Sequence, residues 1–462
     1  MKKLIFFVLV VVLAITACKK DPDPEPIMAQ EIILDKTILT LEVGHSETII
    51  ATILPNNADD RSITWSSSKE SVATIDATGK VIAIASGVAT IIATTNNGKY
   101  ATCEVTVYQI VDSGTIGTLS WTLMDDGTLT ISGKGAMPDF LSDKPWEDYS
   151  DEIKTIIIFE GVTSIGDFTF GGCENLENVT IPESVTSIGD FAFGGCGKLP
   201  SITIPEGVAS IGDNTFNFCA NLTNITIPES VTSIGKFAFH WAGLINVTIP
   251  EGVTSIGEGA FSYCDDLESV TISEGVITIE DEAFRGCISL KSLTIPESVT
   301  SIGNNTFYGC NELSSIIIPN SVTSIGREAF AYCSRLINVT IPEGVVRLNW
   351  AVFFGCASLT SVTIPNSVTS IELGAFGYCE SLTSITIPSS VTRIGSGLSS
   401  AFFFCDNLTS VTIMATTPPT MFGADNFAHN SDDTLYVPKG CVDLYKADAA
   451  WNSAFTTITE QP

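Results

Sequence analysis

Hydrophobic and polar residues follow two different patterns along this chain. Between residues 31 and 107, short runs rich in Ile, Val and Thr alternate with polar residues, and clusters of Gly, Asn and Asp separate the runs. This pattern predicts strands of an all-β sandwich at 32–34, 39–43, 63–65, 72–75, 81–83 and 88–92. From about residue 153, the hydrophobic positions instead recur about every 23 residues. A repeat of that length predicts stacked coils that share one continuous core.

The repeat has the form LxxVTIPxSVTSIGxxAFxxC, and a cysteine marks its register. The marks are Cys173, Cys196, Cys219, Cys264, Cys287, Cys310, Cys333, Cys356, Cys379 and Cys405, and Ala242 takes the place of one further cysteine. A phenylalanine stands three residues before every mark, and an isoleucine or leucine forms a second ladder further upstream. One coil cannot bury these groups alone, whereas eleven stacked coils can.

Each repeat carries a short strand that ends at proline, such as residues 179–182. Because side chains alternate along a strand, we expect the valine and isoleucine to point inward and the threonine to point outward. The outward positions are Thr180, Thr203, Thr226, Thr248, Thr271, Thr294, Thr340, Thr363 and Thr386, and Ile317 interrupts them. This predicts a parallel sheet with a small, uncharged outer face, which is a candidate binding face. The alternative is that threonine and serine are simply favourable residues of an exposed strand.

Both ends of the array carry segments that can cap it. Residues 121–123 and 128–131 flank an Asp-Gly turn, which predicts a hairpin before the first coil. At the other end we expect a strand at 434–438 and a short helix at 442–454, with Leu444, Tyr445 and Trp451 covering the last coil. A repeat array needs such caps to stay soluble.

Two stretches resemble known families. The runs 63–68, 71–76, 79–81, 87–91 and 101–107 resemble bacterial immunoglobulin-like domains of group 2, and the repeat resembles the BspA-like, or Treponema-type, leucine-rich repeat. The resemblance implies a mainly β protein, in which an Ig-like sandwich (31–108) precedes a capped leucine-rich-repeat solenoid with a parallel sheet. The solenoid would comprise an N-terminal cap hairpin (109–152), the repeats (153–413) and a C-terminal cap (414–462). The Ig-like domain would serve as a spacer or as an adhesive module.

The first residues resemble an export signal. Lys2 and Lys3 precede an apolar run from residue 4 to 15, which is too short to span a membrane comfortably. The following Ile-Thr-Ala-Cys resembles the lipobox of bacterial lipoproteins, which implies a signal peptide at 1–17, lipid on Cys18 and a proline-rich tether at 18–30. The acidic residues behind the cysteine resemble a surface-export signal, so we expect an outer-membrane protein that faces outward. An ordinary signal with an incidental Cys18 is the alternative.

The composition excludes several functions. Acidic residues outnumber basic ones by 52 to 22, and the net charge of −30 argues against nucleic-acid binding. The three histidines are far apart in sequence, so we expect no metal site, no cofactor and no catalytic cluster, and hence no enzyme. Parallel neighbouring cysteines do not suit disulfide geometry, so we expect buried free thiols.

Two charged features stand out on the predicted surface. A glutamate follows the strand proline in most coils, which suggests a stripe that recruits divalent cations or a basic partner. Arg327, Arg335 and Arg347 form the only basic cluster of the array, which suggests a docking patch.

The family resemblance implies adhesion to a host extracellular-matrix protein, a bacterial surface protein or a glycan, with the membrane contacted through the lipid anchor. A glycan-capture subunit of a nutrient-uptake system and a structural spacer are the alternatives.

Overall fold

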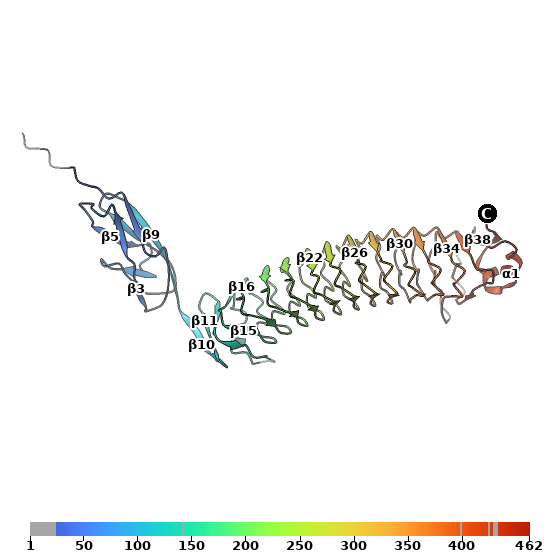
Figure 1. The fold of residues 1–462 in the computed structure, drawn as a ribbon, viewed down its shortest axis with the longest axis horizontal. Coiled ribbons are helices and arrows are strands. Elements are labelled where there is room, and N and C mark those ends of the chain that lie inside the picture. Colours follow the sequence, from blue (N-terminus) through green and yellow to red (C-terminus); the bar gives the residue numbers. More distant parts are fainter. Residues whose placement is uncertain (1–24, 141–142, 398–399, 424–425, 428–432) are drawn as a thin grey trace, which may run out of the picture. The chain divides into compact units, whose positions relative to one another are not determined.

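The computed structural model describes residues 25–140, 143–397, 400–423, 426–427 and 433–462 (Figure 1). The predicted signal peptide and Cys18 therefore lie outside the described residues. The chain divides into two compact units, one that ends at Gln109 and one that begins at Ile110. Each unit has its own buried hydrophobic core.

The first unit is a β-sandwich. Its strands are β1 (Glu31–Leu34), β2 (Ile38–Glu42), β3 (Ser46–Thr48), β4 (Ala51–Leu54), β5 (Ile63–Ser67), β6 (Ala73–Ile75), β7 (Lys80–Ala83), β8 (Gly87–Thr95) and β9 (Tyr100–Tyr108). Strands β2, β9, β8 and β5 form one sheet, β3, β7 and β6 form another, and β1 pairs with β4. Alternate residues are buried between them, including Ile91, Cys103 and Val105. The predicted strands include neither β3, whose three residues are all exposed, nor β4, which has one buried residue.

The second unit is a solenoid, and Figure 1 shows its coils stacked one after another. One strand of each coil joins a parallel ladder along one side. These strands are β14 (Thr155–Ile158), β16 (Asn178–Thr180), β18 (Ser201–Thr203), β20 (Asn224–Thr226), β22 (Asn246–Ile249), β24 (Ser269–Ile272), β26 (Ser292–Thr294), β28 (Ser315–Ile317), β30 (Asn338–Thr340), β32 (Ser361–Thr363) and β34 (Ser384–Ile387). Where neighbouring strands pair, equivalent residues lie side by side, as Thr248 does with Thr271. The predicted fold, a sandwich followed by a capped solenoid with a parallel sheet, is confirmed.

A second parallel ladder, built from very short strands, runs along another side of the coils. Its members are β15 (Val162–Ile165), β17 (Ser187–Ile188), β19 (Ser210–Ile211), β21 (Ser233–Ile234), β23 (Ser255–Ile256), β25 (Thr278–Ile279), β27 (Ser301–Ile302), β29 (Ser324–Ile325), β31 (Arg347–Leu348), β33 (Ser370–Ile371) and β35 (Arg393–Ile394). The buried residues of this ladder are the predicted isoleucine column. The sequence pattern predicts that the column is buried but not that it forms strands, because two residues are too few to show alternation.

The phenylalanines that recur once in each coil form a continuous stack through the core. Neighbouring ring centroids from Phe170 to Phe427 lie 5.0–5.8 Å apart, and most pairs are nearly parallel. Trp146 stacks on the first ring at 5.8 Å, and Trp451 stacks on the last at 5.8 Å. Both tryptophans are fully buried. The stack therefore ends in a large aromatic cap on each side.

The marker cysteines are buried and unpaired, as predicted. From Cys196 onward, the Sγ of each lies 2.9–3.4 Å from the backbone oxygen of the stacked phenylalanine in the preceding coil and donates a hydrogen bond to it. Burial raises the pKa of Cys219, Cys264 and Cys310 to about 12. The thiols are therefore protonated donors that link adjacent coils rather than nucleophiles.

Ala242 offers a direct test of this thiol bond. Ala242→Cys should raise the free energy of unfolding by about 0.5 kcal/mol, because a weak S–H donor would reach the Phe216 oxygen. The reverse change, Cys264→Ala, should cost about 1 kcal/mol through the lost bond and the lost volume. Urea unfolding of both variants measures the effects. If Ala242→Cys is destabilising and Cys264→Ala is neutral, the thiol bond has no role.

The N-terminal cap contains the predicted hairpin, β11 (Leu119–Met124) and β12 (Thr128–Gly133), and one further strand, β10 (Ile110–Ile116). Strand β12 pairs in parallel with β14, so the cap begins the first ladder. The short β13 (Gly135–Ala136) begins the second ladder beside β15. The 3-10 helix η1 (Glu147–Tyr149) follows Trp146.

The C-terminal cap continues both ladders before it closes them. Strands β36 (Ser410–Ile413), β38 (Thr434–Val437) and β39 (Thr457–Glu460) extend the first, and β37 (Thr420–Met421) extends the second. The predicted single helix is two helices, α1 (Val442–Ala447) and α2 (Ala449–Ala454), because Asp448 accepts backbone N–H bonds from Ala450 and Trp451 and starts a new helix. Tyr445 and Trp451 are buried as predicted, but the prediction for Leu444 is wrong. Its side chain lies on the outer side of α1 and is 54% exposed.

None of the helices in the described part of the chain has the length and apolar character to cross a membrane.

Candidate functional site

The outer face of the first ladder is the face that the sequence predicts. Its exposed positions are the nine predicted threonines, Thr180, Thr203, Thr226, Thr248, Thr271, Thr294, Thr340, Thr363 and Thr386. The strand residue two positions before each of these threonines is an exposed serine or asparagine, such as Asn178 and Ser201. Ile317 interrupts the threonine column and is 67% exposed. We name this surface the strand face.

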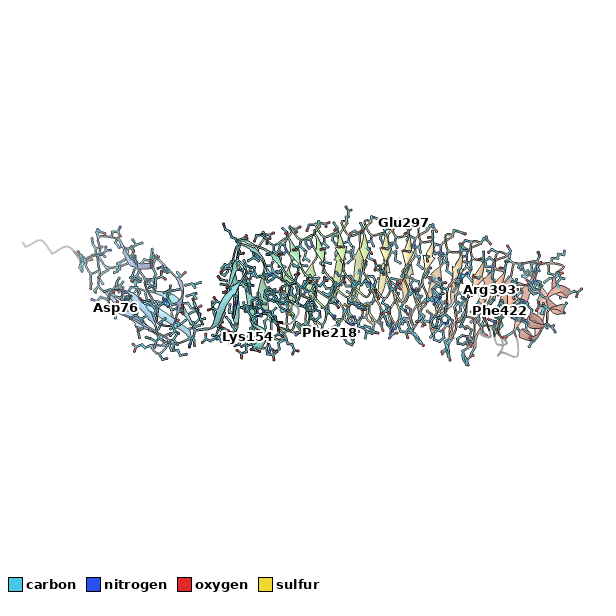
Figure 2. The ribbon with its side chains drawn as sticks, turned by 90° about the horizontal axis from the view of Figure 1, so that it is seen from below. Asp76, Lys154, Phe218, Glu297, Arg393 and Phe422 are labelled. Carbon is cyan, nitrogen blue, oxygen red and sulfur yellow. The ribbon has the colours of Figure 1, made fainter. Side chains whose placement is uncertain are left out.

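The glutamate stripe lies immediately beyond the strand face. Glu183, Glu229 and Glu297 are exposed at the start of the turn after each strand (Figure 2 labels Glu297). The turn is closed by a backbone bond from the Val185 N–H to the Pro182 oxygen at 3.1 Å, and Ser184 Oγ donates to the Val162 oxygen of the preceding coil at 2.7 Å. Among the described residues, no group of three or more His, Cys, Asp or Glu side chains has the geometry to hold a metal ion. The stripe is therefore a row of separate charges, and the hypothesis of a divalent cation site finds no support in the structure.

The predicted arginine patch is divided between two places. Arg327 and Arg347 line one shallow hollow of about 390 Å³ with Trp350 and Glu372. Arg335 is not among its lining residues and instead forms an ion pair with Glu312 of the preceding coil. The two arginines that the structure brings together are the ones beside the second ladder.

Arg393 and Glu372 complete this group, and neither was predicted from the sequence. Arg347 and Arg393 occupy the same register position two coils apart, with Ser370 between them. Glu372 forms an ion pair with Arg393 and lies 3.6 Å from the Nε of Arg347. The Glu372 side chain is only 12% exposed. Its carboxylate is shared by the two arginine side chains. A spacing of two repeats between the two arginines is the signal that could have predicted the group.

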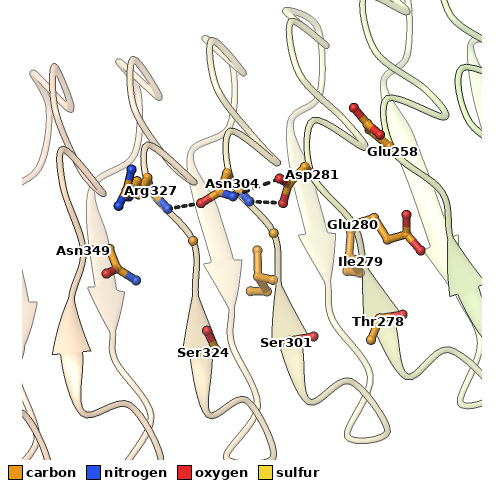
Figure 3. A pocket seen from close by; sticks show the side chains of 13 residues that line it. Glu258, Thr278, Ile279, Glu280, Asp281, Ser301, Asn304, Ser324, Arg327 and Asn349 are labelled. Atoms are coloured by element: carbon orange, nitrogen blue, oxygen red, sulfur yellow. Dashed lines mark hydrogen bonds between the residues drawn. The ribbon is translucent and has the colours of Figure 1, made fainter.

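A larger hollow of about 590 Å³ opens beside the second ladder (Figure 3). Its lining is polar and includes Glu258, Glu280, Asp281, Asn304 and Arg327. Asp281 accepts the backbone N–H of Asn304 at 2.7 Å, and Asn304 Oδ1 accepts the backbone N–H of Arg327 at 2.8 Å. These side chains therefore join successive coils, and their acceptors are occupied by the fold.

The same bond is made by aspartates in the earlier coils. Asp167 accepts from the Asp190 backbone N–H at 2.7 Å, and Asp190 accepts from that of Asp213 at 2.8 Å. Burial, reinforced by the charges of Asp167 and Asp213, raises the pKa of Asp190 above its ordinary value. A carboxyl group with a raised pKa in the folded state destabilises that state as the pH rises through it, because the folded chain holds the proton more tightly than the unfolded chain.

This coupling predicts a pH-dependent gain from Asp190→Asn. Asn304 already makes the bond without a charge, so the variant keeps the acceptor and removes the repulsion. We expect a gain in the free energy of unfolding of at most about 0.5 kcal/mol at pH 7, because the carboxylate is only partly buried and solvent screens its charge. The gain should vanish at a pH well below the ordinary pKa of aspartate. Urea unfolding at both pH values measures it, and an equal gain at both would exclude a charge effect.

A column of aromatic residues on the loops was also not predicted from the sequence. Phe218, Trp241 and Tyr332 occupy the position directly before a coil mark and are partly exposed. Glycine holds this position in five coils, so in sequence it resembles a variable loop.

The architecture defines a class of protein, a leucine-rich-repeat solenoid that carries an Ig-like domain before it. The family model described as BspA type leucine rich repeat region matches residues 148–268, 254–381 and 325–447. These matches cover more than half of the chain, and the protein belongs to this family. The model of bacterial Ig-like domain (group 2) matches residues 28–105. The family indicates a binding role for the repeat array.

Several known proteins are similar to parts of this chain. Lacto-N-biosidase of Bifidobacterium bifidum is 48% identical over 69 residues, which are 15% of this chain and 6% of that protein. A leucine-rich repeat protein from Bacteroides ovatus has 27% identity and a TM-score of 0.48, covering 75% of this chain and 100% of that chain. A leucine rich cell surface protein from Faecalibacterium prausnitzii has 30% identity and a TM-score of 0.40, covering 65% of this chain and 94% of that chain. The chain spans 6–19% of the length of the first curated relatives that it matches.

Proposed function

We propose that the protein is a lipid-anchored recognition protein of the outer membrane that faces outward. Its solenoid binds a host extracellular-matrix protein or a bacterial surface macromolecule without catalysing a reaction. The observation that carries the proposal is the strand face, because an in-register column of exposed threonines presents the same small polar group in nine coils. Many weak identical contacts on a rigid surface give avidity for a ligand that also repeats.

The distribution of ionisable groups supports binding rather than catalysis. Aspartate and glutamate side chains recur at fixed positions in successive coils, such as Asp167, Asp190 and Asp213. A catalytic site needs one cluster of unlike groups around a reacting atom. The buried thiols are protonated donors to backbone oxygens, so they are poorly placed to act as nucleophiles.

Capture of a glycan is the second candidate function, and the chemistry of the strand face favours it. Threonine and serine hydroxyls and asparagine amides both donate and accept hydrogen bonds, which suits the hydroxyl groups of a sugar chain. The strand positions of this face hold no charged side chain between β16 and β34. A neutral glycan would thus meet no repulsion on the face itself.

Substitutions on the strand face separate binding from a spacer role. Thr226→Lys, Thr271→Lys and Thr340→Lys, combined in the full chain, place three long charged side chains on an exposed surface. The matched control carries serine at the same three positions and keeps the small hydroxyl. Arrays of matrix proteins and glycans should capture the wild type and the serine variant but not the lysine variant. Silence of the wild type on both arrays would favour the spacer, and equal capture of all three would place the ligand elsewhere.

The anchor is tested separately in cells. With Cys18→Ala, we expect loss of the lipid and release of the protein from the membrane fraction. Mass spectrometry of the mature N-terminus shows whether the lipid is present. If the variant stays in the membrane fraction and its mass differs from that of the wild type only by the substitution, the lipid anchor is contradicted. The binding proposal would not be affected.

A further inference from the structure

The residue directly before each coil mark has a left-handed backbone. It is glycine in five coils, with φ between 71° and 78°: Gly172, Gly195, Gly286, Gly309 and Gly355. It is aromatic in the other six, with φ between 57° and 60°: Phe218, Trp241, Tyr263, Tyr332, Tyr378 and Phe404. No other residue type occurs at this position.

The backbone geometry explains the glycines but not the aromatic residues. The left-handed turn directs the N–H of this residue to a carbonyl of the next coil, as from Gly286 to Tyr308 at 2.7 Å and from Trp241 to Ser262 at 3.0 Å. Glycine adopts this conformation freely, whereas a residue with a Cβ is strained in it. Residues with a Cβ also adopt a left-handed backbone at a second position of the coil, as Glu282 does with φ 58°. The conformation therefore favours glycine but does not explain why every replacement is aromatic. The consistent choice of an aromatic side chain points to a role beyond the fold.

These aromatic side chains join others into a continuous surface. Their neighbours occupy the position just after the stacked phenylalanine. We name the whole set the aromatic ribbon, and its members are Phe218, His240, Trp241, Tyr263, Tyr308, Tyr332, Phe354, Tyr378, Phe403 and Phe404. Successive rings lie 4.7–5.7 Å apart on either side of Arg285. Five of the six left-handed aromatic residues are 38–53% exposed.

The aromatic ribbon lies away from the glutamate stripe, and Figure 2 shows Phe218 and Glu297 near different edges of the solenoid. Aromatic residues and arginine are the residue types that most often anchor protein interfaces. The strand face lacks both, so the aromatic ribbon is a distinct surface with different chemistry.

The chain already places one cation in the ribbon. The guanidinium carbon of Arg285 lies 4.9 Å from the centre of the Tyr308 ring and 6.0 Å from that of Tyr263. Glu282 accepts a hydrogen bond from the same guanidinium at 3.1 Å. Arg285 thus fills the interval between two rings that are two coils apart, with a carboxylate beside it.

Charge around the ribbon also favours a cation. Glu328 occupies the same coil position as Glu282, two coils further along, where Ala331 takes the place of Arg285. Asp265 and Asp266 follow the mark in the coil of Tyr263. The whole chain carries a net charge of −30. A basic partner is therefore attracted at long range and can then stack on the rings.

We propose that the aromatic ribbon binds the arginine side chains of an extended segment of a basic partner protein. Each guanidinium stacks on a ring of the ribbon as Arg285 does, and carboxylates such as Glu328 lie beside it. Arginine suits this surface better than lysine, because its planar guanidinium stacks on aromatic faces. This surface adds to the proposed function and does not depend on the strand face.

The test uses the full chain and a synthetic peptide of alternating arginine and glycine. The variant combines Trp241→Gly, Tyr332→Gly and Tyr378→Gly, which are changes to the residue that the chain itself uses at this position. These substitutions relieve backbone strain and leave the net charge unchanged. We expect the melting temperature to be maintained, while the affinity for the peptide falls about tenfold, as three lost cation–π contacts imply. Calorimetric titration at physiological salt measures the affinity.

Two controls define what would overturn the proposal. Phe159→Ser removes an exposed phenylalanine outside the ribbon and should leave the affinity unchanged. A lysine–glycine peptide should bind the wild type more weakly than the arginine peptide. Equal affinity of the wild type and the triple variant for the arginine peptide would refute the proposal. A neutral polysaccharide is titrated in the same way. If it binds the wild type but not the triple variant, while the affinity for the arginine peptide is the same for both, the aromatic ribbon binds sugars instead.

Discussion

Replacing Phe284 by alanine should destabilise the solenoid by about 3–5 kcal/mol, the range for loss of a fully buried phenylalanine. The Phe284 ring stacks between Phe261 and Phe307, with interplanar angles of 6° and 2°. Its removal leaves a cavity that the rigid coils on both sides cannot close. Because each coil contacts only its neighbours, the loss should concentrate at the centre of the array.

Limited proteolysis and hydrogen exchange of the full chain measure this effect. We expect new cleavage and faster exchange around residue 284 and little change near the caps. Ile317→Thr is the matched control, because it restores the common residue at an exposed position of the strand face and should change stability by less than about 0.5 kcal/mol. A uniform loss of protection along the array would mean that the coils do not unfold locally.

Trp451→Ala should expose the open end of the solenoid. Trp451 is fully buried, stacks on Phe427 and Phe455, and donates its Nε1–H to the Pro419 oxygen at 2.9 Å. We expect a loss of about 3–5 kcal/mol for the cap and self-association of the variant, because the last ring of the stack and two parallel ladders would become accessible.

Light scattering across a range of concentrations measures that self-association. Leu444→Ala is the control, because Leu444 lies in the same cap but is 54% exposed. This variant should self-associate no more than the wild type does. A Trp451→Ala variant that is no more associated than the control would show that the strands beyond the helices protect the end by themselves.

The repeated parts of the fold could be predicted because each structural position is sampled eleven times. A single phenylalanine three residues before a cysteine says little, whereas the column from Phe170 to Phe402 shows that the position is buried. The same repetition identified the exposed threonines and the unpaired cysteines. In the caps at the two ends of the array, each structural position occurs only once. The break between the helices at Asp448 and the exposure of Leu444 were therefore not predicted.

The arrangement of side chains across coils was harder to predict. The pairing of Glu372 with Arg393 depends on how two coils lie side by side. The aromatic ribbon escaped because its column alternates between glycine and bulky rings, which in sequence is typical of a tolerant loop. Only the backbone angles show that both residue types occupy one strained conformation.

The central claim is that near-identical coils stack in register and leave a preformed outer surface. Spin labels on cysteines introduced at strand-face threonines test this most directly, since the marker thiols are buried and protonated. One label at Thr203→Cys is paired in turn with Thr294→Cys, Thr340→Cys or Thr386→Cys, which lie four, six and eight coils away. At a strand spacing of about 4.8 Å, the distances measured by pulsed electron paramagnetic resonance should be about 19, 29 and 38 Å. Broad distributions, or distances that do not increase with the number of coils, would contradict the stack.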